Sequence, residues 1–271
     1  MICRVIGVSR SSYYSWLHNP LSKRSKRILT IDAKVKDSFF FHKKRYGANR
    51  IYRELRNQGI PCTRGFISQR MKAMFLVAKS TFQKKRTTVT CKDNVIAPNL
   101  LKRNFLSSVP NEKWVTDITH IKTKGGCLYL CVVIDLFSRA VIGWSLQSHM
   151  RASLVNDALR MALLKRENPK NVIIHSDKGS QYCSNLFRES IRRNNLNQSM
   201  SGVGACYDNA ACESFFHSLK VECVHNEVFN NEHEAKVAVI NYIESYYNRT
   251  RMHSYNQYIP PLEFEKSVKI R

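Results

Sequence analysis

The chain has 271 residues, and 44 Lys and Arg against 20 Asp and Glu give it a formal net charge of +24. This length exceeds that of a typical single hydrophobic core, so two or more compact units are expected. The sequence contains no bilayer-spanning apolar stretch, no signal peptide, no CxxC pair and no phosphate-binding GxxxxGKS or GxxxxGKT loop. These absences argue against a membrane protein and predict a reduced, cytoplasmic protein without a nucleotide cofactor.

The positive charge is concentrated in the first part of the chain. Residues 1–112 hold 24 Lys and Arg against five Asp and Glu, whereas residues 113–271 hold 20 against 15. A basic surface attracts polyanions and gains affinity when their counterions are released. The first part is therefore predicted to bind nucleic acid, and the alternative is an ordinary solvated basic surface.

The first 20 residues have the pattern of half a helix-turn-helix motif. A Gly7-Val8 turn precedes Ser9, which can cap a helix that carries Arg10 and Tyr13. Only six residues precede the turn, too few for a complete first helix, so residues 1–20 are interpreted as a partial motif. Arg10 and Tyr13 are candidate DNA contacts.

Residues 21–80 are predicted to form a second, basic helical region that resembles a helix-turn-helix. A helix is expected over about residues 28–44, followed by two shorter helices that a Gly-Ile-Pro sequence separates. Three arginines on the two shorter helices are candidate DNA contacts, namely Arg50, Arg64 and Arg70. A basic helical hairpin that does not touch DNA is the alternative.

From Lys113 the hydrophobic pattern changes to that of an α/β fold. Three β-rich runs, WVTDITHI, LYLCVVIDLF and AVIGWSL, precede alternating helices and strands in the order β-β-β-α-β-α-β-α. This order predicts a mixed five-stranded sheet flanked by helices over residues 113–228. Residues 81–112 before it are predicted to be a linker, and residues 229–271 a C-terminal helix and tail that pack on the core.

Three acids occupy positions that favour a metal site. Asp117 lies within the first strand, Asp177 ends an apolar strand in HSDKGSQY, and Glu213 lies in the helix of DNAACESFFHSLK. Carboxylates at one sheet edge repel each other unless a divalent cation offsets their charge, and Mg²⁺ prefers oxygen ligands. These acids are therefore the candidate catalytic and metal-binding residues, with Mg²⁺ or Mn²⁺ as cofactor. Asp135 and Asp208 are interpreted as turn and helix caps.

Two histidines and a lysine lie near the three acids. Lys220 and His217 share a predicted helix face with Glu213, so Lys220 is a candidate contact to DNA phosphate. A solvated helix lysine is the alternative. His175 and His217 are candidate supporting residues around the metal ligands, and a core position is the alternative for His175.

The motifs resemble those of the OrfB transposases, the second-reading-frame products of the IS-three insertion-sequence family. The acids are separated by 59 and 35 residues, and the second spacing is that of the DD(35)E integrase-core transposases. The resemblance covers essentially the whole chain through WVTDITHI, LYLCVVIDLFSRAVIGWS, HSDKGSQYCS, SMSGVGACYDNAACESFFHSLKVE and YIESYYNRTRMHS. It implies a ribonuclease-H-like fold, two divalent metals held by the acids, and a basic residue seven positions after the glutamate, here Lys220.

The resemblance also implies an activity and partners. The expected reaction is DNA strand cleavage and strand transfer at the ends of an insertion sequence, without a covalent protein intermediate. The expected partners are double-stranded DNA, as terminal inverted repeats and target, and the upstream OrfA product, joined to this frame by a frameshift. Joining two DNA ends indicates a dimer or a larger oligomer.

Three other functions compete with this reading. A retroviral-type integrase is disfavoured, because its N-terminal zinc module needs a cysteine pair and His18 and His42 have no CxxC partner. A DNA-binding regulator of the element would account for residues 1–80 but leaves the three acids unexplained. An inactive transposon remnant also stays open, although the triad is intact.

Overall fold

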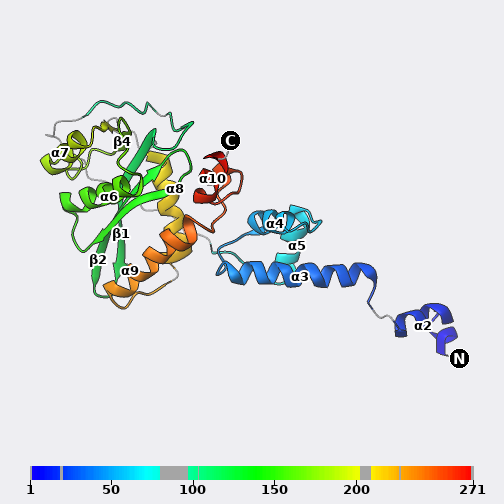
Figure 1. Cartoon of the computed structure of the whole chain (residues 1–271). Coiled ribbons are helices and arrows are strands. Elements are labelled where there is room, and N and C mark those ends of the chain that lie inside the picture. Colours follow the sequence, from blue (N-terminus) through cyan, green and yellow to red (C-terminus); the bar gives the residue numbers. More distant parts are fainter. Residues whose placement is uncertain are drawn as a thin grey trace. The chain divides into compact units, whose positions relative to one another are not determined.

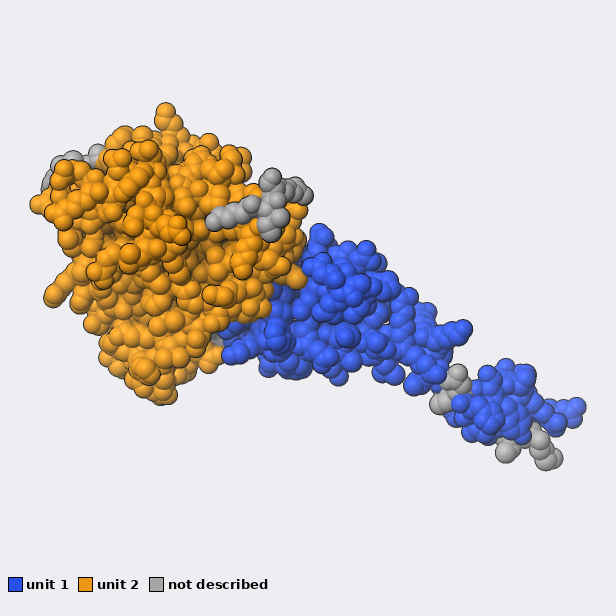
Figure 2. All heavy atoms as spheres, viewed as in Figure 1, with its two compact units in different colours: residues 1–79 blue, residues 80–271 orange. Residues whose placement is uncertain are grey.

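A computed structural model describes residues 2–18, 21–79, 97–102, 104–201, 209–225 and 227–269. The chain divides into two units, residues 1–79 and residues 80–271 (Figure 2). In the described part of the chain, no helix is both long enough and apolar enough to cross a membrane.

The first unit is helical. It comprises α1 (Ile2–Val5), α2 (Arg10–His18), α3 (Lys23–Phe41), α4 (Ala48–Asn57) and α5 (Arg64–Ala73). The long helix begins at Lys23, earlier than the expected residue 28, because the Ser22 hydroxyl accepts a hydrogen bond from the backbone N–H of Ser25. Apolar side chains of α3, α4 and α5 form a small core, whereas α2 buries none of its residues.

The second unit is built on a five-stranded sheet. Its strands are β1 (Lys113–Thr123), β2 (Gly126–Asp135), β3 (Val141–Gln147), β4 (Ile173–Ser176) and β5 (Asn197–Met200). Their order is β3-β2-β1-β4-β5. The pairs β1–β2 and β2–β3 are antiparallel, and the pairs β1–β4 and β4–β5 are parallel. The prediction of a mixed five-stranded sheet is therefore confirmed, and β1 is its central strand.

Helices cover both faces of this sheet (Figure 1). The helices of this unit are α6 (Ala152–Lys165), α7 (Asn185–Arg193), α8 (Ala210–Leu219), α9 (Glu232–Asn241) and α10 (Pro261–Lys269). Alternate residues of β2 enter different cores, since Val133 packs with α6 and α7 and Val132 packs with α8 and α9. On the α6 face, Gly143 of β3 allows close packing, because an added Cβ would lie 2.3 Å from the carbonyl oxygen of Ala158.

Part of the predicted linker packs on the second unit. Residues 80–96 and 103 lie outside the described residues, but Leu101 is only 1% exposed and belongs to the core on the α8 face. Its backbone N–H, and that of Leu100, donate to the Ser199 hydroxyl of β5. The mostly polar and basic composition of the segment gave no sequence signal for this contact.

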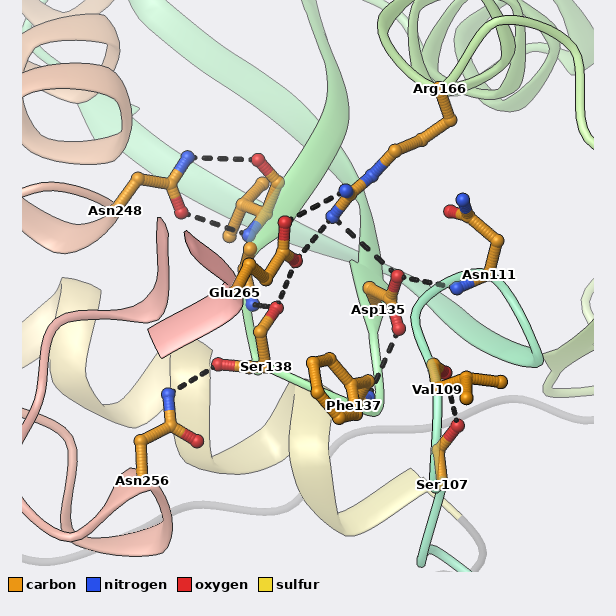
Figure 3. A network of polar contacts seen from close by, with 12 residues as sticks. Ser107, Val109, Asn111, Asp135, Phe137, Ser138, Arg166, Asn248, Asn256 and Glu265 are labelled. Carbon is orange, nitrogen blue, oxygen red and sulfur yellow. Dashed lines mark hydrogen bonds and ion pairs between the residues drawn. The ribbon is translucent and has the colours of Figure 1, made fainter. Parts of the chain in front are cut away.

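A buried polar network ties the C-terminal segment to the sheet (Figure 3). Asp135 caps the turn after β2 by accepting from the backbone N–H of Phe137, and it lies 3.5 Å from the Arg166 guanidinium. Arg166 also pairs with Glu265 of α10, which accepts a hydrogen bond from Ser138. Burial raises the pKa of Asp135 to about 6, although its hydrogen bonds and Arg166 oppose this effect.

A second buried ion pair holds the end of the α8 segment. The helix continues as a π-helix over Lys220–Val224, and Glu222 in this turn accepts a bidentate pair of hydrogen bonds from Arg251. Both side chains are 5% exposed, and Arg251 also donates to the Ser218 hydroxyl. The C-terminal segment therefore fixes α8 at its far end.

Removing one member of this pair should strongly destabilise the second unit. Arg251→Met leaves the Glu222 carboxylate buried without its cation, so the free energy of unfolding should fall by about 3–5 kcal/mol. Urea unfolding monitored by tryptophan fluorescence measures this change. The double variant Arg251→Met with Glu222→Leu should be less destabilised than Arg251→Met alone, and an equally unstable double variant would contradict the explanation.

Candidate active site

The parallel pairing of β1 and β4 brings two of the predicted acids together. Val115 of β1 pairs with His175 of β4. Asp117 follows the first of these residues by two positions, and Asp177 follows the second by two positions. Because parallel strands keep the same register as they advance, Asp117 and Asp177 reach the same level of neighbouring strands.

Electrostatic coupling between the acids is visible at Asp117. Burial, together with the neighbouring charges of Asp177 and Glu213, raises the pKa of Asp117 to about 7. The backbone N–H of Ile118, which donates to Asp117 Oδ1 over 2.8 Å, and the charge of Lys220 act in the opposite direction. The carboxylate therefore lies where negative charge is costly and where a cation would be stabilised.

The second acid has a similar environment. Burial raises the pKa of Asp177, and the backbone N–H of Gly179, which donates to Asp177 Oδ1 over 3.0 Å, lowers it. This bond holds the carboxylate at the start of the loop that follows β4. Two half-buried acids on adjacent strands thus converge at the same edge of the sheet.

Glu213 approaches this edge from α8. It lies in the first turn of that helix, it is exposed, and its charge raises the pKa of Asp117. Among the described residues, no three His, Cys, Asp or Glu side chains are arranged to hold one metal ion. The structure therefore brings Glu213 within electrostatic range of Asp117 without placing all three acids at coordination distance. Asp208, expected to cap this helix, lies outside the described residues, and Asn209 occupies the N-cap position.

The donor chemistry of these residues fits a hard divalent cation. Carboxylate oxygens are the ligands that Mg²⁺ and Mn²⁺ prefer, and repulsion between adjacent acids falls when a cation lies between them. Lys220 is half-buried, and burial lowers its pKa while the charge of Asp117 raises it. One lysine supplies a single positive charge, which cannot neutralise three carboxylates.

The two histidines of the prediction have different surroundings. His175 is fully buried, and its Nδ1 lies 2.8 Å from the Ser199 hydroxyl while its Nε2 lies 3.3 Å from that of Ser201. These contacts link β4 to the strand beside it. His217, in contrast, is exposed on α8.

Three buried side chains beside the acids were not expected from the sequence. The Tyr182 hydroxyl lies 3.1 Å from Thr116 Oγ1, and Asn209 Nδ2 donates to the carbonyl oxygen of Thr116 over 3.1 Å. Thr116 directly precedes Asp117. The DNAACES segment contains Asn209, but no sequence pattern shows where an asparagine amide will point.

The candidate DNA contacts of the first unit differ in their availability. Arg10 and Arg64 are exposed, and Tyr13 is half-buried. Arg50 lies over the Tyr46 ring, 5.4 Å from its centroid. Arg70 donates two hydrogen bonds of 2.8 and 2.7 Å to the carboxylate of Asp32. This bidentate pair joins α5 to α3, so Arg70 has a structural role in this unit.

The first unit also contains a cavity of about 460 Å³ that the sequence did not indicate. It lies among the start of α3, the end of α4 and the turn before α5. Three arginines line it, namely Arg24, Arg27 and Arg56, together with the apolar surfaces of Ile28, Cys62 and Phe66. Arg24 and Arg27 lie one helical turn apart on α3 and Arg56 lies on α4, so no single local motif identifies all three.

The raised pKa of Asp117 predicts a pH-dependent effect of its removal. A carboxyl group whose pKa is higher in the folded than in the unfolded state destabilises the folded protein increasingly as the pH rises toward the folded value. In EDTA, Asp117→Asn should therefore raise the melting temperature by more at about pH 8 than at about pH 5. Differential scanning calorimetry measures both values, and an equal gain at the two pH values would show that burial and like charge do not act on this carboxyl.

The structure comparison matches a viral intasome and the catalytic domain of a mariner transposase. The simian T-cell lymphotropic virus intasome is 16% identical, with a TM-score of 0.46, covering 86% of this chain and 74% of that chain. The catalytic domain of Mos1 mariner transposase is also 16% identical, with a TM-score of 0.41, covering 50% of this chain and 71% of that chain.

Sequence comparisons identify the family. Residues 107–206 and residues 213–268 each match an integrase core domain family. Transposase InsF for insertion sequence IS3A of Escherichia coli K12 is 45% identical over 97% of this chain and 92% of its own length. The transposase for insertion sequence element IS904 of Lactococcus lactis is 39% identical over 92% of this chain and 99% of its own length. The chain therefore belongs to the IS3 family of insertion-sequence transposases, with an integrase core.

Proposed function

We propose that Asp117, Asp177 and Glu213 are the catalytic carboxylates of this transposase and that they hold two divalent ions, Mg²⁺ or Mn²⁺. The observation that carries this proposal is the parallel pairing of β1 with β4, which brings Asp117 beside Asp177. The effect of both Asp177 and Glu213 on the pKa of Asp117 supports the inclusion of all three acids.

The chemistry at these residues is cleavage and transfer of DNA strands. Bound divalent ions would activate a water or a DNA 3′-hydroxyl and stabilise the leaving oxygen of an in-line displacement. Asp117 and Asp177 supply rigid oxygen ligands, because the strands and the backbone N–H groups of Ile118 and Gly179 fix their positions. Glu213 supplies a ligand from a helix and must approach the two aspartates more closely for all three to share an ion.

Lys220 is proposed to contact a phosphate of the DNA. It begins the π-helix at the end of α8, and its charge acts on Asp117. A half-buried cation near the three acids can bind a phosphodiester without adding to their mutual repulsion. His175 supports the site from inside the sheet by holding β4 to β5, and His217 flanks Glu213 on α8.

Double-stranded DNA is the proposed substrate, as terminal inverted repeats and as target. Residues 1–79 carry 18 Lys and Arg against three Asp and Glu, and two of these acids already have basic partners in Arg70 and His42. The remaining positive charge favours a polyanion, with Arg10, Tyr13, Arg50 and Arg64 as candidate contacts. We further propose a cytoplasmic protein that acts as a dimer or larger oligomer, fused in its active form to the upstream OrfA product.

A DNA-binding regulator without catalysis is less well supported. Such a protein would gain nothing from two half-buried, mutually repelling carboxylates at one sheet edge. Regulators need the basic unit alone.

Neutralising one aspartate should separate catalysis from DNA binding. Asp177→Asn keeps the shape of the side chain and removes one negative ligand, so strand cleavage should fall by a factor on the order of 10³ or more. A Mg²⁺- or Mn²⁺-dependent cleavage assay on terminal-repeat DNA measures this loss, and a gel-shift assay measures the retained DNA affinity.

The matched control is Asp157→Asn, which neutralises a half-buried acid on α6 that accepts a hydrogen bond from Gln147. This variant should cleave at close to the wild-type rate. If Asp177→Asn cleaves as well as the wild-type protein, Asp177 is not a catalytic ligand.

A further inference from the structure

Asn209 connects the helix of the third acid to the strand of the first. It lies at the N-cap of α8, four residues before Glu213, and is 7% exposed. Its Nδ2 donates a 3.1 Å hydrogen bond to the carbonyl oxygen of Thr116, the residue before Asp117. This one side chain therefore joins the backbone next to Asp117 to the helix turn that carries Glu213.

The amide of Asn209 does not act as an ordinary helix cap. Other caps in the chain, such as Ser22, Thr63 and Asn231, accept a hydrogen bond from the first turn of their helices. The Asn209 side chain makes no such bond, although asparagine is among the best N-cap residues. Its Oδ1 is buried and has no hydrogen-bond partner in the described part of the chain.

Both departures follow from the direction of the amide nitrogen, which faces the Thr116 carbonyl of β1, while the side chain makes no capping bond to the backbone of its own helix. A buried acceptor without a partner is unfavourable and calls for an explanation. The Asn209 amide gives up the capping bond for the bond to Thr116, which fixes the position of α8 relative to β1. Repulsion from Asp117 and Asp177 pushes Glu213 away from the sheet edge, and a tether at the helix start opposes that displacement.

We propose that Asn209 is a positioning residue that holds the first turn of α8 against β1 and so limits the approach that Glu213 must make to share a divalent cation with Asp117 and Asp177. The proposal rests on the assignment of these acids as metal ligands. Arg251 holds the other end of the same segment through Glu222 and Ser218, so α8 is fixed at both ends. Phe215 and Leu219 fill the core between these two anchors.

Metal binding by Asn209 variants tests this role without relying on activity. Asn209→Ala removes the amide, and Asn209→Asp keeps its shape but replaces the donor by an acceptor. Both should weaken Mn²⁺ binding roughly tenfold or more, as removal of groups that orient metal ligands does. Isothermal titration with Mn²⁺ alone measures the dissociation constant, and the Mn²⁺ concentration that gives half-maximal cleavage should shift in parallel.

Asn248→Ala is the matched control. Asn248 is also a buried asparagine that tethers a helical segment to a strand, through two 2.9 Å hydrogen bonds with the backbone of Val141. Its removal should lower the melting temperature and leave the Mn²⁺ dissociation constant unchanged. Wild-type affinity in Asn209→Ala, or an equal loss in Asn248→Ala, would overturn the positioning role. If Asp177→Asn binds Mn²⁺ as tightly as the wild-type protein does, the assignment of the acids as metal ligands fails instead.

The cavity of the first unit carries a second, independent inference. None of the eight described residues that line it is acidic, and three of them are arginines. Arg27 donates to the carbonyl oxygen of Pro61 over 2.8 Å, which directs its guanidinium along the cavity wall. Arg24 and Arg56 are exposed and have no acidic partner among the described residues, unlike Arg70. The cavity therefore has a basic rim over an apolar floor.

We infer that this cavity binds a nucleotide unit of DNA, with its phosphate at Arg24, Arg27 and Arg56. The sugar or base would lie against the apolar floor formed by Ile28, Cys62 and Phe66, because guanidinium groups pair with phosphate and apolar surfaces exclude water. This site deepens the proposed DNA binding of the first unit and supplies contacts that differ from the helix arginines Arg50 and Arg64.

Paired charge removal distinguishes this cavity from general electrostatic attraction. The double variant Arg24→Ala with Arg56→Ala should weaken DNA binding and lower the slope of log affinity against log salt by about 0.9, the value for one lost phosphate contact. Lys34→Ala with Lys36→Ala removes two exposed charges from α3 in the same unit and should change affinity less. Equal losses in both double variants would overturn the cavity as a site.

Protection of Cys62 supplies a readout at the cavity itself. Cys62 is half-buried in the floor, so bound DNA should slow its reaction with iodoacetamide, while half-buried Cys127 in the second unit should react at an unchanged rate. Peptide mass spectrometry measures both rates. Comparing duplex with single-stranded oligonucleotides shows whether the nucleotide in the cavity belongs to paired or unpaired DNA. Unprotected Cys62 under saturating DNA of both kinds would contradict the inference, whereas absence of any DNA binding would contradict the proposed function.

Discussion

The arrangement of this molecule depends on two carboxylates held at the same level of neighbouring parallel strands. Burial disfavours ionisation of both Asp117 and Asp177, and like charge adds to this effect at Asp117, so the fold bears an electrostatic cost at this edge. Elsewhere in the unit, buried acids such as Asp135 and Glu222 have arginine partners. Asp117 has no arginine among the groups that set its pKa, which is the condition under which a divalent cation gains most on binding.

The rest of the second unit serves to keep this edge and α8 in a fixed relation. The five-stranded sheet sets the two aspartates, and apolar contacts pack α8 against β1 and β2. Asn209 joins the start of α8 to β1, and Arg251 clamps its end through Glu222. Glu213 thus belongs to a helix that is anchored on both sides, although it is the most exposed of the three acids.

The sequence predicted the parts of this structure that depend on local pattern. The alternation of apolar residues indicated the five strands, and acids in buried strands indicated Asp117 and Asp177. It did not indicate contacts between distant segments. The bidentate pair of Arg70 with Asp32 joins two helices, and Arg24 and Arg56 meet at a cavity that only the folded helices create. The orientation of the Asn209 amide likewise depends on where Thr116 lies in the sheet, which no local pattern specifies.

The first unit carries most of the net positive charge, and the second unit carries the three carboxylates that are proposed to hold divalent ions. Anomalous X-ray diffraction from crystals of the protein with Mn²⁺ tests this proposal most directly. The account predicts a Mn²⁺ peak bonded by oxygens of Asp117 and Asp177 at roughly 2 Å, with Glu213 completing the set. Manganese bound elsewhere, with these three carboxylates free of metal at saturating concentration, would contradict the account.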